Sequence, residues 1–225
     1  MATSHHETSN AIEDYAKAIY VLEQRGEGAV STNSLAERLG VTAASASGMV
    51  RRLDEMGLVT HVPYKGVQLT GEGTRLALEV LRHHRLLELY LAESLGVPWD
   101  RVHAEAEVLE HVLSEELEEA IADKLGNPTR DPHGDPIPTA DLRVDESETV
   151  ALQTLANGQA GTFVRVSDSD PAMLRYLSER GISPGDRFQV IDKQPFEGPV
   201  FARFGGEVHV LGGRLAAAMR VEAER

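Results

Sequence analysis

The chain of 225 residues contains no cysteine, which excludes disulfide bonds, thiolate metal ligands and cysteine nucleophiles. It also lacks any apolar run of the roughly 18–20 residues that a membrane-spanning helix requires. Its first residues, MATSHHETSN, have neither the basic segment nor the apolar core of a secretory signal. These absences predict a cytoplasmic protein with no membrane partner.

Positive charge is scarce, with 22 Lys and Arg residues against 36 Asp and Glu residues and a net charge of −14. The excess of acids is greatest between residues 74 and 142. A chain of this charge repels a phosphate backbone, so any contact with DNA must come from a local basic surface. The acidic run itself is typical either of a solvated helix face or of a site for a divalent cation.

Residues 8–70 have the pattern of a winged helix-turn-helix. A helical stripe in 8–24 is followed by two short helices, TNSLAERL and AASASGMVRRLDEMG, and by two strand-like runs in LVTHVPYKGVQLT. In this arrangement the last helix enters the major groove and the hairpin contacts phosphates, although a three-helix protein-interaction domain would show the same pattern. The residues expected to contact DNA are Thr42, Ser45, Ser47, Arg51, Arg52 and Lys65.

Residues 72–126 predict two long helices, the second running without a break to Gly126. The first helix places His84 and Glu88 one turn apart, and Asp14 offers a carboxylate from the first helix of the chain. The stretch HAEAEVLEH lines one side of the second helix with four further groups: His103, Glu107, Glu110 and His111. A single His–Glu pair is usually a solvated ion pair, but such groups on three elements indicate a metal site.

The remaining sequence changes period. NPTRDPHGDPIP cannot continue a helix, and His133 within it is expected to be an ordinary loop residue. Five short alternating runs follow residue 159, with one helical stretch at 173–181. The predicted fold is mainly α with a C-terminal all-β domain. Its parts are a winged helix-turn-helix (1–73), a helical metal-binding and dimerisation domain (74–140), a linker (141–158) and an SH3-like small barrel (159–225).

The candidate ligands also bear on the metal. Oxygen-rich sites with imidazole and no sulfur suit Mn²⁺ or Fe²⁺. Because affinity follows the Irving–Williams order, Co²⁺ or Zn²⁺ could also occupy such sites in vitro. Crowded carboxylates repel one another, so a bound dication would stabilise a packing that their charges oppose. Mn²⁺ is the expected cofactor.

Several motifs closely resemble the diphtheria-toxin-repressor family of metal-dependent repressors. They are EDYAKAIY (13–20), RHHRLLE (82–88), VHAEAEVLEHVLS (102–114) and DPHGDPIP (131–138), together with the winged helix. The resemblance covers essentially the whole chain, including the C-terminal SH3-like domain. It implies a homodimer that binds an inverted-repeat operator in double-stranded DNA when metal is bound.

The resemblance further implies two metal sites in each subunit. The regulatory site falls on Asp14, Glu107, Glu110 and His111. The ancillary site falls on His84, Glu88, His103 and a carboxylate of the C-terminal domain, with Asp168 favoured over Asp170.

Two positions favour the manganese-responsive branch of this family. The iron-responsive branch has methionine where Asp14 stands and cysteine where Glu107 stands. Lys17 departs from the best-known manganese regulators, which carry a ligating glutamate there, and this puts their two-metal cluster in doubt. The predicted function is a manganese-dependent repressor of metal homeostasis. The alternatives are an iron-dependent repressor of the same family and a winged-helix regulator that responds to an organic ligand. A metalloenzyme is disfavoured because no nucleophile or oxyanion motif is present.

Overall fold

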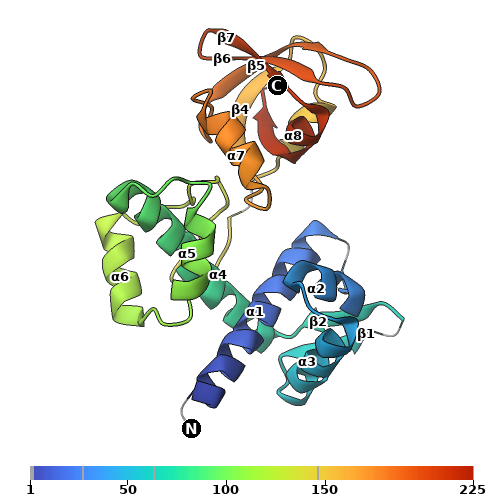
Figure 1. Cartoon of the computed structure of the whole chain (residues 1–225), viewed down its shortest axis with the longest axis vertical. Helices are drawn as coiled ribbons and strands as arrows, with labels where there is room; N and C mark the ends of the chain where they lie inside the picture. Colours follow the sequence, from blue (N-terminus) through green and yellow to red (C-terminus); the bar gives the residue numbers. More distant parts are fainter. Residues whose placement is uncertain (1–2, 27, 63, 146, 225) are drawn as a thin grey trace. The chain divides into compact units, whose positions relative to one another are not determined.

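The computed structural model describes residues 3–26, 28–62, 64–145 and 147–224 (Figure 1). They form two compact units. The first comprises Met1–His83, Glu110–Leu113 and Pro138–Leu142, and the second comprises His84–Leu109, Ser114–Ile137 and Arg143–Arg225. Among the described residues, no helix is both long enough and apolar enough to cross a membrane.

The first unit contains the expected winged helix-turn-helix. Helices α1 (Thr3–Arg25), α2 (Thr32–Leu39) and α3 (Ala43–Glu55) precede the antiparallel strands β1 (Val59–Val62) and β2 (Gly66–Leu69), and α4 (Gly71–Leu95) follows. Figure 1 shows α2 and α3 grouped with the hairpin. Ser31 and Thr42 begin α2 and α3 because each side chain accepts a hydrogen bond from the N–H three residues on. Gly40 ends α2 in the left-handed region, at φ 65°.

The wing is fixed to the helices by close backbone packing. Val30, just before α2, pairs with Val67 of β2. Gly66 has φ 127°, and a Cβ there would lie 2.0 Å from the Val30 carbonyl oxygen. Only glycine fits this position. The hairpin therefore has a defined place beside the core formed by α1, α2 and α3.

The helical part of the second unit differs from the sequence prediction. The predicted continuous helix is two helices, α5 (Val102–Leu109) and α6 (Glu115–Lys124). The break arises because Ser114 accepts a hydrogen bond from the Leu117 N–H and so begins a new helix, whose first turn is acidic. Glu110 and His111 therefore lie in the turn after α5 and not on a continuous helical face.

The rest of the second unit is a six-stranded antiparallel sheet in the order β3-β8-β4-β5-β6-β7. Sequence reasoning found five of these strands and one helix but missed α8, whose six residues GRLAAA have no side-chain N-cap. The elements are β3 (Val150–Ala151), the 3₁₀ turn Leu152–Thr154, β4 (Ala160–Val166), α7 (Pro171–Ser178), β5 (Arg187–Lys193), β6 (Val200–Phe204), β7 (Glu207–Leu211), α8 (Gly213–Ala218) and β8 (Met219–Ala223).

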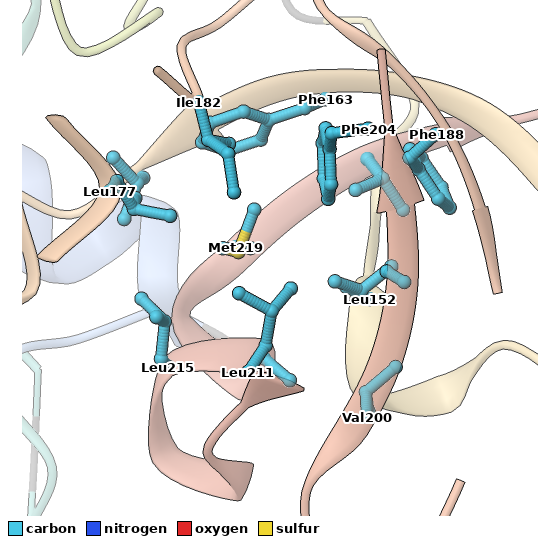
Figure 2. Close-up of a cluster of buried hydrophobic side chains, with 14 of the residues drawn as sticks. Leu152, Phe163, Leu177, Ile182, Phe188, Val200, Phe204, Leu211, Leu215 and Met219 are labelled. Atoms are coloured by element: carbon cyan, nitrogen blue, oxygen red, sulfur yellow. The ribbon is translucent and has the colours of Figure 1, made fainter. Parts of the chain in front are cut away.

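This sheet surrounds an apolar core, as expected for an SH3-like domain. Figure 2 shows Phe163, Phe204, Leu211 and Met219 directed into the same interior, and all are buried. The strand register shifts between Phe163 and Arg165 and again between Val190 and Asp192. Such irregularities bend strands and allow the sheet to curl around its core.

Candidate metal centres

The first group of candidate ligands lies in the first unit and consists of Asp14, Glu110 and His111, here called the first centre. One ligand atom from each lies within 4.8 Å of the other two. His111 Nε2 is 3.1 Å from Asp14 Oδ1 and 3.6 Å from Glu110 Oε1. Asp14 Oδ1 is buried and has no hydrogen bond of acceptable geometry among the described residues. A cation between these atoms would satisfy it, so the three residues fit a divalent metal ion.

Two charged residues border the first centre. Glu13 Oε2 lies 2.6 Å from His111 Nδ1, a contact that turns the other ring nitrogen towards Asp14 and Glu110. Lys17 Nζ donates to Glu110 Oε1 at 2.5 Å, and both side chains are buried. Sequence reasoning missed Glu13, because nothing in its spacing distinguishes it from an exposed acid.

The charge of His111 responds strongly to these carboxylates. The carboxylates of Asp14 and Glu13 raise the pKa of His111 from 6.5 to about 10, against the opposing effect of burial. The ring is therefore an imidazolium at neutral pH in the metal-free chain. A cation that binds Nε2 must displace a proton, which couples metal affinity to pH.

The second group lies entirely in the second unit and consists of His84, Glu88, His103 and Asp168, here called the second centre. His84 Nε2 is 3.1 Å from Glu88 Oε1 and 3.0 Å from His103 Nδ1. His103 Nδ1 also lies 3.0 Å from Asp168 Oδ2 and 3.2 Å from Glu88 Oε1. Two imidazoles and two carboxylates thus converge from α4, α5 and the segment that follows β4.

Electrostatics explain how this centre is held without a metal. Burial lowers the pKa of His103, but hydrogen bonds to Asp168 and Glu88 outweigh it and raise the value to about 10. Burial raises the pKa of Asp168, yet His103 brings it down to about 2. Burial also raises the pKa of Glu88, but the neighbouring imidazoles, His84 first, hold it well below its usual range. Protons here occupy the positions at which a cation would bind.

The structure also distinguishes between the two aspartates considered for this centre. Asp168 contacts His103, whereas Asp170 is the N-cap of α7 and accepts a hydrogen bond from the Ala172 N–H. Asp170 Oδ2 also lies 3.6 Å from Arg214 Nη2. The geometry therefore brings Asp168, and not Asp170, to the second centre.

Glu107 lies beside the second centre. Its Oε1 is 3.8 Å from His84 Nδ1 and 3.6 Å from His103 Nε2, and its side chain is 40% exposed. Because Glu107 and Asp14 belong to different units, the assignment of Glu107 to the first centre stays a prediction.

His133 is not the ordinary loop residue that the sequence suggested. Its side chain is 1% exposed, and its Nδ1 lies 3.6 Å from Glu88 Oε2. His133, Glu88 and Asp131 form a further buried group whose ligand-type atoms lie within 4.8 Å of one another. Nothing along the chain indicates this burial, since Pro132 and Gly134 on either side of His133 are typical of an exposed turn.

The residues expected to contact DNA lie on α3, at its N-cap and in the wing. Thr42, Ser45, Arg51, Arg52 and Lys65 are exposed, and Ser47 is half-buried. Thr42 Oγ1 is engaged with Ser45 as the cap of α3, and Ser47 Oγ donates to the Ala43 carbonyl. The hydroxyl groups of Thr42 and Ser47 therefore also make hydrogen bonds within α3 and its N-cap. Tyr64, also fully exposed next to Lys65, adds an aromatic ring to the wing that the sequence reasoning did not include.

A winged helix joined to buried clusters of imidazole and carboxylate defines a metal-responsive DNA-binding protein. Comparison with known protein families supports this class for three successive parts of the chain. Residues 7–67 match the iron dependent repressor N-terminal DNA binding domain, 70–139 the iron dependent repressor metal binding and dimerisation domain, and 150–223 the FeoA domain.

The chain belongs to the iron-dependent repressor family, which includes the diphtheria toxin repressor, and is a metal-dependent transcriptional repressor. It is 33% identical to the iron-dependent repressor IdeR of Mycobacterium tuberculosis over 96% of this chain and 99% of that protein. It is 30% identical to the diphtheria toxin repressor of Corynebacterium diphtheriae over 93% of this chain and 96% of that one. A solved manganese-dependent transcriptional repressor in complex with manganese is 44% identical, with a TM-score of 0.88 over 95% of this chain and all of that chain.

Proposed function

We propose that the protein is a manganese-dependent repressor that binds an inverted-repeat operator as a homodimer and controls metal homeostasis. The observation that carries this proposal is the donor set of the two centres, which contains only carboxylates and imidazoles in a chain without cysteine. Hard oxygen donors with imidazole suit Mn²⁺. The similarity to a solved repressor that is manganese-dependent by name supports the same choice.

Each subunit would hold Mn²⁺ at two centres. Asp14, Glu110 and His111 would hold one ion at the first centre, with Glu107 as a further proposed ligand. His84, Glu88, His103 and Asp168 would hold another at the second centre. The bound ion supplies positive charge that the carboxylates lack, and this offsets their mutual repulsion.

The first centre lies where it can act on the DNA-binding helices. Asp14 belongs to α1, which packs against α2 and α3, while Glu110 and His111 come from the turn after α5. When these side chains share an ion, α1 is tied to that turn. Loss of the tie allows more conformations, so operator binding then costs additional ordering free energy.

Exposed apolar side chains on the helices of the second unit support dimerisation. Leu95 at the end of α4, Val108 on α5 and Leu117 on α6 are 61%, 70% and 51% exposed. Apolar side chains that gather into one exposed patch are typical of an interface. A symmetric dimer would place two α3 helices in successive major grooves, about 34–36 Å apart. A repressor of this kind would act in the cytoplasm, where its operator is.

The proposal is tested by selecting binding sites from a pool of randomised DNA duplexes in Mn²⁺ and then measuring fluorescence anisotropy on the selected duplex. Mn²⁺ and anaerobic Fe²⁺ are compared at matched free-ion concentrations, with Co²⁺, Zn²⁺ and EDTA as references. We expect binding in Mn²⁺ that EDTA reverses. Tighter binding in Fe²⁺ at the same free concentration would favour the iron-dependent alternative. Equal binding in EDTA would contradict a metal sensor and favour a regulator responding to an organic ligand.

A further inference from the structure

The loop at residues 131–135, with sequence DPHGD, is held in a single conformation by its own first residue. Asp131 Oδ1 accepts hydrogen bonds from the backbone N–H groups of His133 and Asp135, at 2.8 and 2.9 Å. The Asp131 N–H donates to the Asp135 carbonyl at 3.0 Å. Asp131 and His133 are both buried, so the loop is part of the interior and not a free connection.

On one side the loop contacts the helices that supply the second centre. His133 Nε2 donates to the Trp99 carbonyl at 2.8 Å, and the two rings stack 5.8 Å apart. The opposite ring nitrogen, Nδ1, faces Glu88 Oε2 at 3.6 Å. The other oxygen of Glu88 is the one that contacts His84 and His103. His133 thus lies behind a proposed ligand and faces the oxygen that the centre does not use.

On its other side the loop contacts strand β4, which leads to Asp168. The His133 carbonyl accepts the Val166 N–H at 3.0 Å, and Asp135 Oδ1 pairs with Arg165 Nη1 at 3.1 Å. Gly134 packs directly on the strand, where a Cβ would lie 1.9 Å from the Val164 carbonyl oxygen. Asp168 follows the end of β4 by two residues. The loop therefore fixes the strand end from which this ligand extends.

We propose that the 131–135 loop is the positioning element of the second centre. The His133 ring orients the Glu88 side chain, and the contacts of Gly134 and its neighbours with β4 fix the position of Asp168. The inference rests on the proposed function, because it assumes that the second centre holds a metal ion. It adds that the loop assembles ligands from the helices and from the SH3-like domain into one site without itself binding metal.

Charge balance explains why Glu88, Asp131 and His133 support a ligand and do not form a third metal site. One dication in the second centre is balanced by Glu88 and Asp168, and Asp131 already has a cationic neighbour in Arg85, whose Nε lies 3.8 Å from Asp131 Oδ2. A second dication would add two uncompensated positive charges to a buried space. Buried charge without a counter-charge is strongly unfavourable.

The sharpest test replaces a glycine that touches no ligand. Gly134→Ala would push β4 from the loop, while Gly126→Ala is the matched control: both glycines have positive φ, at 89° and 75°, but a Cβ at Gly126 meets nothing within 4 Å. Each change is made in full-length protein that carries Asp14→Asn, so that only the second centre titrates. Free Mn²⁺ is followed by its electron paramagnetic resonance signal. We expect Gly134→Ala to weaken Mn²⁺ binding by about tenfold or more and Gly126→Ala to leave it unchanged.

Trp99 provides an independent reading, since it is the only tryptophan and packs against both His133 and the SH3-like core. We expect its emission to shift to longer wavelength in Gly134→Ala and not in Gly126→Ala. His133→Phe keeps the stacked ring but removes both nitrogens, and should also weaken Mn²⁺ binding by about tenfold. That variant keeps the inference testable if Gly134→Ala does not fold.

The outcomes separate the two proposals. The Mn²⁺ uptake of the Asp14→Asn protein is compared with that of the same protein carrying His103→Ala as well. If His103→Ala removes none of the uptake, the second centre of the proposed function is wrong. If the Asp14→Asn protein takes up one equivalent and neither Gly134→Ala nor His133→Phe changes the affinity, the positioning role is wrong. Uptake of two equivalents, one of them lost in His133→Phe, would also overturn it, because the loop would then be a ligand.

Discussion

Lys17 Nζ lies 2.5 Å from Glu110 Oε1, and the two side chains are 10% and 0% exposed. The pair places an ammonium group beside the first centre, next to a proposed metal ligand. We expect the positive charge of this lysine to disfavour a second cation beside Glu110. We therefore expect the first centre to hold one metal ion beside one ammonium group.

Removal of that ammonium group should lower the stability of the metal-free protein, and Mn²⁺ should restore it. Lys17→Met removes the ammonium group that contacts the buried carboxylate of Glu110, which should cost about 3 kcal/mol. Saturating Mn²⁺ should recover most of this loss, because the ion then supplies the missing charge. Urea unfolding with and without Mn²⁺ measures both quantities. An unchanged free energy of unfolding in the metal-free variant would show that the pair contributes nothing.

Metal affinity and metal-free stability should respond to pH in opposite directions. The pKa of His111 is raised from 6.5 to about 10 in the folded chain. Its ion pairs therefore stabilise the metal-free fold fully below pH 6.5, and this contribution is lost as pH rises towards 10. Mn²⁺ must displace the same proton, so the affinity of the first centre should rise by roughly tenfold for each pH unit within that range.

Calorimetry tests this coupling directly. Titration of Mn²⁺ into the protein in buffers of different ionisation enthalpy should show about one proton released at the first centre. The Asp14→Ala variant identifies which part of the signal belongs to that centre. An affinity that does not change between pH 6.5 and pH 8, with no proton release, would contradict the protonated state of His111.

Glu107→Ala tests the ligand whose place the structure leaves to prediction. As a ligand of the first centre, Glu107 should be required for Mn²⁺-dependent operator binding. Glu105→Ala is the matched control, since it removes an exposed acid from the same helix. If Glu107→Ala binds operator normally in Mn²⁺, Glu107 does not belong to the regulatory site and only interacts with the imidazoles of His84 and His103.

The DNA-binding surface should divide into positions that set affinity and positions that set sequence preference. Arg51→Ala should weaken binding to all duplexes alike. It should also reduce the slope of the logarithm of the binding constant against the logarithm of salt concentration by about one, as expected for a phosphate contact. Ser45→Ala should instead change which sequences are selected. Anisotropy over a salt series and repeated site selection distinguish these outcomes. If the effect of Arg51→Ala depends on the DNA sequence, Arg51 contacts a base and not a phosphate.

Much of this molecule was predictable because its signals are local. The cap at Thr42 and the glycine at Gly40 mark the helix-turn-helix, and the His84–Glu88 spacing marks a pair of candidate ligands. The break before α6 was missed because apolar periodicity continues across it, although Ser114 begins the new helix. The roles of Glu13 and His133 depend on which elements meet in space, and no spacing along the chain encodes that.

The most direct test of the account compares operator binding by the wild type and Asp14→Ala at saturating Mn²⁺, with Glu105→Ala as control and dimer mass measured in parallel. The account predicts that Asp14→Ala stays a folded dimer but loses more than about tenfold of its Mn²⁺-dependent affinity, while Glu105→Ala binds as the wild type does. Mn²⁺-dependent binding that persists unchanged in Asp14→Ala would contradict a regulatory metal site at the first centre.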